Sequence, residues 1–447
     1  MDSPPPSIGW ETKPFSEPRW KGMWPPLSGE EKALLSRALD RLYHTPPQEE
    51  NPPLRPLVES CAEEEGWTLS PRQRAYLERV IREQTREAGP LTALLAMGSV
   101  EEVSITGMGA THPVRIYDSP HGWMETPLFF EDVGYTVSLL NRMARESGSR
   151  LSGETPILNA RIPGGMRLHA SMAPICQSPV QASIRRFTHR PTHPRELIPT
   201  RIGSPELFAY LEYALSCDSN VLVAGTTGSG KTTTLNALAH VFPVNERIVT
   251  IEETPELSLA HTHRVSLFPK AGTPYDMPRL IRETLRMRPD RVIIGEIRFP
   301  EEARAFMESI LSGQGKGTYA TFHGHSPHET IARLRQYGIL DQDIGWIDVL
   351  VIQRRWTRAG KNPGEYFPMR RITEVVELEY DPGFGLTIRP IFTYSPSSDD
   401  WKSFPSSRVA GKFPTYFPGM DWSSSLARKA NASKGGKRDA GNSYPKS

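Results

Sequence analysis

The chain has 447 residues, of which 37% are hydrophobic and 23% charged, and its formal net charge is +2 at pH 7. This length allows two or three packed domains, and the balanced charge argues against binding of nucleic acid through overall charge. The three cysteines, Cys61, Cys176 and Cys217, lie far apart without a C-x-x-C spacing, which argues against a disulfide framework and a cysteine zinc site.

The apolar runs are shorter than the roughly 20 residues that a membrane span requires. The first residues also lack the basic-then-apolar pattern of a signal peptide. We therefore expect a soluble, cytoplasmic protein that reaches a membrane only through a partner.

Two small domains are predicted in the first half of the chain. Residues 1–27 are rich in proline and tryptophan, and we expect them to be irregular. Residues 28–98 carry helix-start signals and apolar residues at helical spacing, which predict a helical domain. Residues 99–190 combine strand-like alternation with one helical segment, which predicts a small α+β domain. Residues 191–203, "PTHPRELIPTRIG", are predicted to be a linker stiffened by prolines.

An α/β domain is predicted from residue 204 to residue 395. Its strand candidates are short apolar segments separated by helical stretches, as expected for strands that are covered on both faces. These candidates are residues 221–224, 247–252, 291–295 and 317–323. The segment "RRITEVVELEYDPGFGLTIRPIFTY" predicts a terminal hairpin.

The end of the chain, residues 396–447, has a different composition. It is rich in Ser, Gly, Lys and Pro and lacks periodicity, so we expect a largely disordered tail.

The segment "GTTGSGKT" matches the pattern G-x-x-x-x-G-K-[ST] in full, between a predicted strand and a predicted helix. Glycines allow backbone N–H groups to converge on phosphates, and the helix N-terminus adds partial positive charge. Lys231 is expected to reach the β- and γ-phosphates, and the Thr232 hydroxyl to bind Mg²⁺. The phosphate-binding candidates in this segment are Gly225, Thr226, Thr227, Gly228, Ser229, Gly230, Lys231, Thr232 and Thr233.

Acidic residues follow two of the predicted strands. Glu252 and Glu253 end the second strand, and Glu296 ends the third, with Arg298 beyond it. Because ligands of open parallel sheets bind at the carboxyl ends of the strands, these carboxylates are candidates to hold Mg²⁺ and to orient water. We assign Glu296 to the Mg²⁺ shell, directly or through water, and expect Glu252, Glu296 and Arg298 to be catalytic. The alternative for Glu253 is an ordinary surface turn residue.

The fourth predicted strand ends at His323. We expect His323 to lie near the γ-phosphate and to be catalytic. His325 and His328 complete a spacing H-x-H-x-x-H that is compatible with a metal site, although solvated residues at a helix start are the favoured interpretation.

Arginines in the α+β domain form a second group of candidates. They are Arg161, Arg167, Arg185 and Arg186. A cation that approaches the γ-phosphate from another domain or subunit would stabilise developing charge. The alternative for each arginine is a salt-bridged sheet face.

Four motifs occur in a characteristic order: "GTTGSGKTTT", "TIEETPEL", "LRMRPDRVIIGEIR" and "TFHGHSPHETIARL". This order resembles the secretion ATPase superfamily, which powers type II and type IV secretion, type IV pili and the archaeal flagellum. In that family the motifs are the Walker A loop, the aspartate box, the Walker B box and the histidine box. The resemblance runs from about Pro90 to Tyr394 and is nearest to the archaeal flagellum and type IV pilus branch.

The resemblance implies a RecA-like P-loop NTPase domain that follows a small PAS-like α+β domain and an N-terminal helical domain. It further implies a homo-hexameric motor that hydrolyses ATP with Mg²⁺ at the inner face of the cell membrane. The implied partners are a polytopic membrane platform protein and, indirectly, pilin-like filament subunits, with no direct nucleic-acid contact. The motor would assemble a type IV pilus-like or archaellum filament or drive protein secretion.

The resemblance also implies roles for particular residues. Lys231 and Thr232 would bind phosphate and Mg²⁺, and Glu296 would be the Walker B carboxylate. Glu252 would help to activate water, and His323 belongs to the histidine box. Arg167 and Arg185 match arginines that approach the phosphates.

Two departures and two alternatives stay open. His325 stands where the family often has a small or acidic polar residue. Glu253 stands where the family usually has aspartate, so its role is uncertain. A DNA-translocating P-loop ATPase is one alternative function, and an ATP-binding scaffold or regulator with little turnover is the other.

Overall fold

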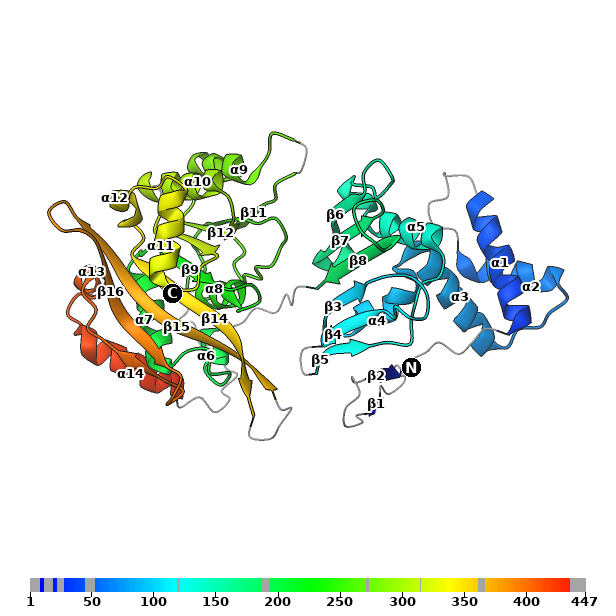
Figure 1. The fold of residues 1–447 in the computed structure, drawn as a ribbon, viewed down its shortest axis with the longest axis horizontal. Coiled ribbons are helices and arrows are strands. Elements are labelled where there is room, and N and C mark those ends of the chain that lie inside the picture. Colours follow the sequence, from blue (N-terminus) through cyan, green and yellow to red (C-terminus); the bar gives the residue numbers. More distant parts are fainter. Residues whose placement is uncertain are drawn as a thin grey trace. The chain divides into compact units, whose positions relative to one another are not determined.

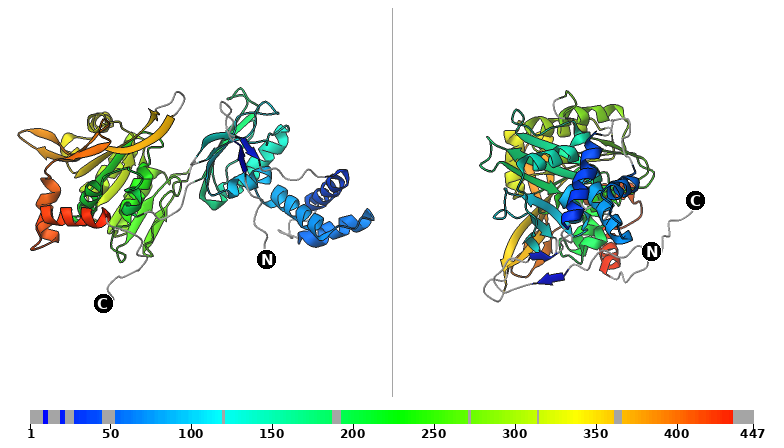
Figure 2. Two further views of the ribbon diagram at one scale, coloured as in Figure 1. Left: turned by 90° about the horizontal axis from the view of Figure 1, so that it is seen from below. Right: turned by 90° about the vertical axis from the view of Figure 1, so that its right-hand side faces the viewer.

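The chain divides into two compact units, Met1–Thr188 and His189–Ser447, each with its own sheet (Figures 1 and 2). The structure is a computed structural model that describes residues 9–11, 19–21, 28–44, 53–118, 121–186, 193–270, 273–313, 315–360 and 366–434. In this described part, none of the helices combines the length and the apolar character needed to cross a membrane.

Three helices lie near the start of the first unit. They are α1 (Gly29–His44), α2 (Leu54–Glu64) and α3 (Pro71–Arg86). Ser70 and Gln73 cap the start of α3, because the side chain of each accepts the backbone N–H of the other. Leu34, Val58 and Leu77 are fully buried among the three helices, so this region has its own core.

A mainly antiparallel sheet of order β1-β2-β5-β4-β3-β8-β7-β6 completes the first unit. Its strands are β1 (Gly9–Glu11), β2 (Arg19–Lys21), β3 (Val100–Ile105), β4 (Arg115–Asp118), β5 (Gly122–Glu125), β6 (Ile157–Ile162), β7 (Met166–Met172) and β8 (Val180–Arg185). The helices with this sheet are η1 (Gly89–Leu91), α4 (Thr92–Ala96), α5 (Val133–Met143), η2 (Arg145–Ser147) and η3 (Pro163–Gly165). Leu139 of α5 is buried in one core with Val103 and Ile184 of the sheet. The prediction that residues 1–27 are irregular is wrong for the backbone of β1 and β2, which pair with each other.

The second unit is built on a sheet of order β11-β10-β12-β13-β9-β14-β15-β16-β17. The strands from β11 to β14 in this order are parallel, and those from β14 to β17 are antiparallel. Their bounds are β9 (Val221–Gly225), β10 (Ile248–Ile251), β11 (Arg264–Leu267), β12 (Arg291–Ile297), β13 (Thr318–Phe322), β14 (Val349–Ala359), β15 (Tyr366–Asp381), β16 (Gly385–Ser395) and β17 (Asp400–Ser403). The four predicted strands and the terminal hairpin are present, whereas β11, β14 and β17 were not predicted.

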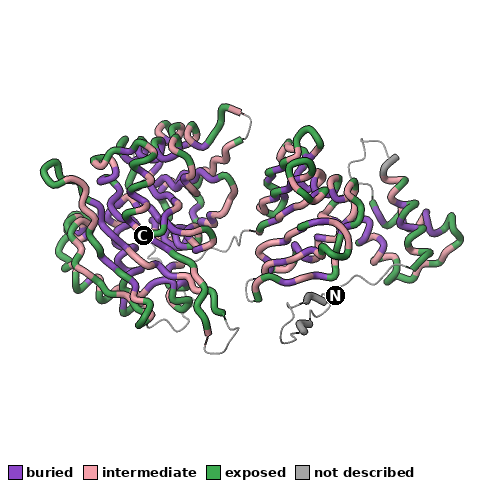
Figure 3. Tube along the Cα trace, in the orientation of Figure 1, coloured by how far each residue is buried: buried purple, intermediate pink, exposed green. Residues whose placement is uncertain are grey.

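Helices cover both faces of this sheet. One face packs with α6 (Pro194–Leu197), α7 (Pro205–Ser216), α8 (Lys231–Ala239), α13 (Arg408–Tyr416) and α14 (Trp422–Lys434). The other face packs with α9 (Met277–Glu283), α10 (Pro300–Leu311), α11 (Pro327–Gln336) and α12 (Asp341–Ile344), and η4 (Thr284–Arg286) follows α9. Val221 and Val223 of β9 point into the first core, and Leu222 and Ala224 into the second. Figure 3 shows this burial along the central strands, which confirms the predicted α/β class.

The prediction of a disordered tail at residues 396–447 is wrong for residues 400–434. This segment forms β17, α13 and α14, and α13 and α14 lie beside α7 (Figures 1 and 2). The buried carboxylate of Glu377 accepts the backbone N–H groups of Ser407, Arg408 and Val409 at the start of α13. Phe413 and Trp422 pack around Tyr213 of α7. A composition-based prediction misses such long-range contacts, and residues 435–447 lie outside the described residues.

The predicted linker at residues 191–203 also differs in part. Residues 194–197 form α6, whose start is capped by His193. Residues 187–192 lie outside the described residues, so the hinge interpretation stays a prediction.

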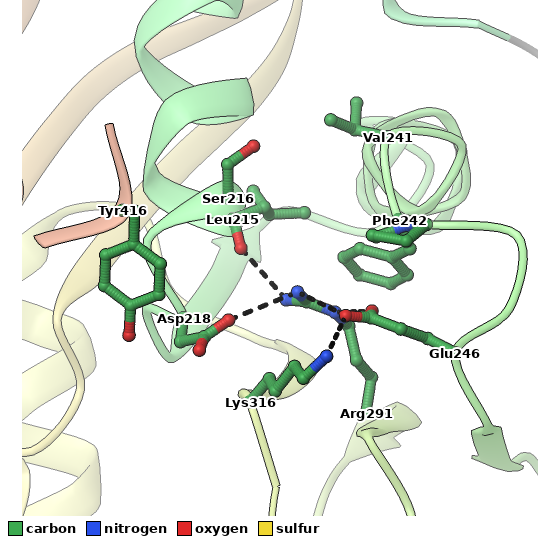
Figure 4. A pocket seen from close by; sticks show the side chains of 10 residues that line it. Leu215, Ser216, Asp218, Val241, Phe242, Glu246, Arg291, Lys316 and Tyr416 are labelled. Carbon is green, nitrogen blue, oxygen red and sulfur yellow. Dashed lines mark hydrogen bonds and ion pairs between the residues drawn. The ribbon is translucent and has the colours of Figure 1, made fainter. Parts of the chain in front are cut away.

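A buried ion network holds the amino ends of the parallel strands together (Figure 4). The guanidinium of Arg291, at the start of β12, donates to both carboxylate oxygens of Glu246 and to the carbonyl of Leu215. Lys316 reaches the same carboxylate, with Nζ 2.7 Å from Oε1. The network lines a pocket of about 240 Å³. Asp218 and Tyr319 also contact the guanidinium. Because Arg291 is only 2% exposed, its charge requires partners of this kind.

We predict that Arg291→Met lowers the free energy of unfolding by about 3–5 kcal/mol, because Glu246 stays buried without its main partner. Urea unfolding followed by circular dichroism measures this change. Lys316→Met is the matched control: the lysine lies at the rim, so the loss should stay below about 1 kcal/mol. Equal effects of the two substitutions would contradict the central role of Arg291.

Candidate functional site

The glycine-rich loop follows β9 and leads into α8. Gly228 and Gly230 have φ values of +70° and +96°, in the left-handed region that favours glycine. Gly230 is the N-cap of α8 and has no side chain that could accept the first backbone N–H groups of the helix. The helix dipole favours an anion at this end of α8.

Gly225 is required by its close approach to the neighbouring strand. A Cβ at this position would lie 2.0 Å from the carbonyl oxygen of Gln353 in β14 and 2.9 Å from Oγ of Ser229. Any larger residue would thus displace the backbone that shapes the loop.

Lys231 is the cation of this loop and is only 7% exposed. Its Nζ donates to the carbonyl oxygens of Gly225 and Thr226, both at 3.3 Å. The same Nζ lies 4.0 Å from Oε1 of Glu296. The ammonium group is therefore held between the loop and the acidic end of β12.

Glu296 lies at the centre of a charged network at the carboxyl edge of the sheet. His323, directly after β13, places Nε2 2.7 Å from Oε1 of Glu296, and Arg298 donates to Oε2 at 2.6 Å. Burial acts to raise the pKa of Glu296, but the hydrogen bond from His323 and the charge of Arg298 outweigh it and lower the pKa to about 2. Arg298 also binds Glu253, so Glu253 has a partner at the edge of the site. Glu253, Arg298, Glu296 and His323 therefore lie together at this edge.

Glu252 occupies a different environment although it follows the adjacent strand β10. Its side chain is buried, and Oε1 accepts the backbone N–H groups of Glu256 and Leu257, each at 2.9 Å. Burial raises the pKa of Glu252 to about 7, against the opposing effect of these hydrogen bonds. The carboxyl group therefore exchanges a proton near neutral pH, which suits a general base.

The remaining loop residues fit a phosphate with a magnesium ion. Thr232 is half-buried and Thr233 is exposed in the first turn of α8, while Thr227 is exposed in the loop. Among the described residues, the buried Oγ of Ser229 has no hydrogen-bond partner, as expected for a polar atom whose partner is a ligand. The Thr232 hydroxyl and the ionised Glu296 offer the oxygen donors that Mg²⁺ prefers.

The two further histidines have ordinary surroundings. Nδ1 of His325 lies 2.8 Å from Oε2 of Glu329, one turn into α11, and His328 is exposed on the same helix. Within the described ranges, no group of three or more His, Cys, Asp or Glu residues is arranged to hold a metal ion. His325 thus binds the carboxylate of Glu329 at the start of α11.

Three of the four arginine candidates form one row across the sheet of the first unit. Arg161 pairs with Arg167 between β6 and β7, and Arg167 pairs with Arg185 between β7 and β8. The residues beside them in each strand are buried, so the arginines point to the opposite face. These buried neighbours are Ile162, Leu168 and Ile184.

Arg186 has a structural role instead. Its Nη1 donates to the carbonyl of Met97 at 2.8 Å, and its backbone N–H donates to the carbonyl of Glu101 at 2.8 Å. The salt-bridged or structural alternative therefore describes Arg186 better than a ligand contact does.

The sequence interpretation missed the contribution of β14 to the loop. Gln353 binds the loop through its side chain, and Arg355 donates its backbone N–H to Oγ1 of Thr226 at 3.3 Å. The Arg355 guanidinium lies 3.1 Å from the position that a Cβ on Gly228 would take. The apolar run "DVLVIQ" that ends at Gln353 was the available signal for this strand.

Comparison with known proteins identifies relatives of the chain. Residues 106–370 match the family model described as type II/IV secretion system protein. An uncharacterized protein of Methanocaldococcus jannaschii is 33% identical over 225 residues, which cover 48% of this chain and 31% of that protein. The type IV secretion system protein VirB11 of Bartonella quintana is 29% identical over 276 residues, which cover 52% of this chain and 75% of that protein.

A solved structure is also similar. The VirB11 ATPase from the Brucella suis type IV secretion system, in complex with sulphate, is 27% identical and covers 64% of this chain and 92% of that chain, with a TM-score of 0.32. The family match confirms the superfamily that the four motifs predict.

The pKa of Glu252 yields a pH-dependent prediction. Because folding raises this pKa from 4.5 to about 7, the stability linked to the protonated form is complete below pH 4.5 and is lost as the pH rises through 7. Glu252→Gln stays neutral and keeps the acceptor Oε1, so it should raise the free energy of unfolding at pH 8 by about 1–3 kcal/mol. Denaturant unfolding at pH 4.5 and at pH 8 measures this difference.

The exposed Glu301 of α10 supplies the control. Glu301→Gln should leave the pH profile as in the unsubstituted protein. A Glu252→Gln variant that is less stable at both pH values would contradict a carboxyl group that is costly to ionise.

Proposed function

Because the chain belongs to the type II/IV secretion system protein family, we propose that it is a motor that hydrolyses ATP. One observation carries the proposal: Lys231 of the glycine-rich loop lies 4.0 Å from Glu296 of the next-but-one strand, where His323 and Arg298 also meet. Phosphoryl transfer to water requires a phosphate-binding loop, an ionised carboxylate and a polar group near the γ-phosphate. The glycine-rich loop, Glu296 and His323 supply these groups at one edge of the sheet.

Each residue has a distinct part in this reaction. Backbone N–H groups of the loop and the ammonium of Lys231 bind the phosphates. The Thr232 hydroxyl and the Glu296 carboxylate would hold Mg²⁺, which neutralises phosphate charge when bound. Glu252, with a pKa of about 7, accepts the proton of the attacking water, and His323 responds through its bond to Glu296 when the γ-phosphate leaves.

The arginine row of the first unit supports a contribution from outside the nucleotide domain. Arg161, Arg167 and Arg185 lie opposite one another across β6, β7 and β8, on the face away from the core. We assign Arg167 and Arg185, with Arg161 beside them, to the phosphates of ATP. Their approach would couple the state of the nucleotide to the position of the first unit.

The assembly and location complete the proposal. The protein would act as a homo-hexamer at the inner face of the cell membrane, bound to a polytopic platform protein. It would drive assembly of a type IV pilus-like or archaellum filament, or protein secretion. Support comes from the family description and from the VirB11 relative, which is named as a type IV secretion system protein.

We predict that Lys231→Ala abolishes ATP turnover and weakens ATP binding at least tenfold, because the buried cation at the phosphates is lost. Phosphate release and equilibrium binding of a fluorescent ATP analogue measure the two effects. Arg304→Ala, an exposed site on α10 outside the four motifs, is the control. ATP hydrolysis that is unchanged in Lys231→Ala would refute the motor assignment.

We predict that Glu296→Gln still binds ATP but hydrolyses it about 100-fold more slowly, because a neutral amide no longer attracts Mg²⁺ or pairs with Arg298. Single-turnover hydrolysis with bound ATP separates this effect from affinity. If the unsubstituted protein, with its membrane partner present, hydrolysed ATP no faster than Glu296→Gln, a nucleotide-gated scaffold would be the better description.

A further inference from the structure

A glutamine of β14 contacts the phosphate loop from the side away from the carboxylates. Strand β14 pairs with β9 in parallel register, from Val349 opposite Val221 to Gln353 opposite Gly225. Its pairing with β15 shifts register between Ile352 and Gln353. This irregularity lies at the point where β9 ends and the loop begins.

The side chain of Gln353 is fully buried and forms two hydrogen bonds to the loop and its helix. Nε2 donates to the carbonyl oxygen of Ser229 at 2.8 Å. Oε1 accepts the hydroxyl of Thr234, in the first turn of α8, at 2.7 Å. One amide group thus connects the last part of the loop to the start of the helix.

The bond to Ser229 fixes the direction of a phosphate-binding donor. In a trans peptide the carbonyl of Ser229 and the N–H of Gly230 belong to one plane and point in opposite directions. Because the carbonyl is held toward Gln353, the N–H of Gly230 is held away from it. A Cβ on Gly230 would lie 3.1 Å from Nε2, so glycine at this position also permits the approach of the amide.

We propose that Gln353 is a positioning residue for nucleotide binding, which holds the Ser229–Gly230 peptide so that its N–H faces the phosphates. The proposal rests on the proposed function only in that the loop binds a nucleotide. Glutamine is suited to the position because it offers a donor and an acceptor on one rigid plane. Methionine fills a similar volume without either group, and glutamate places a second acceptor against the Ser229 carbonyl.

The test measures nucleotide affinity in the full chain, with methylanthraniloyl-ADP as the probe. Gln353→Met should weaken binding about tenfold, as expected for the loss of about 1.4 kcal/mol of loop preorganisation, and Gln353→Glu should weaken it further. Arg354→Ala is the matched control, since this exposed residue is next in the strand and points to the other face. Its affinity should equal that of the unsubstituted protein.

A second measurement separates positioning from general support of the fold. Thr234→Val removes only the hydroxyl that binds Oε1, and in a double-mutant cycle its effect on ADP affinity should be less than additive with that of Gln353→Met. If Gln353→Met melts at a lower temperature without nucleotide but binds ADP within twofold of the unsubstituted protein, Gln353 is only a core residue and the proposal fails.

Failure of the two proposals can be told apart. If the unsubstituted protein binds ADP but does not hydrolyse ATP, the motor proposal fails. The role of Gln353 can then still be tested by measuring ADP affinity. Poor folding of Gln353→Met would leave Thr234→Val to decide, because unchanged ADP affinity in that variant overturns the inference. A chain that binds neither ATP nor ADP overturns both.

Discussion

The parallel pairing of β9 with β13 on one side and β14 on the other is the constraint on which the site depends. In a parallel arrangement every strand ends at the same edge, so residues that are far apart in the sequence meet without any local signal. Glu296, His323 and Lys231 come together for this reason. The strands themselves are buried on both faces, between two hydrophobic cores.

The two carboxylates at this edge have pKa values shifted in opposite directions. Glu296 is surrounded by cationic and donor groups and stays ionised, whereas Glu252 is buried against backbone N–H groups, so its ionisation is costly. Gly295 makes part of this environment, because a Cβ there would lie 3.2 Å from Cγ of Glu252. Two acidic residues with separated pKa values are what a site needs if one group binds a cation and the other transfers a proton.

Local patterns predicted much of this arrangement. The loop "GTTGSGKT" indicated the candidate phosphate site, and the position of Glu296 and His323 after apolar strands indicated the edge at which their side chains meet. The contribution of Gln353 was not predictable, because a glutamine after an apolar run has no signature until the neighbouring strand is known. The folding of residues 400–434 was missed for a related reason: Glu377 and Tyr213, which hold α13 and α14, are distant in sequence. The relation of Arg167 and Arg185 to the nucleotide stays a prediction.

The C-terminal helices have a practical consequence for the definition of the domain. A shortened protein that stops after β16, where the composition changes, would uncover Tyr213 and the apolar surface of α7. It would also leave Glu377 and Asp348 buried without their partners on α13. Such a protein would be prone to aggregate, so the smallest autonomous form of the second unit extends through α14.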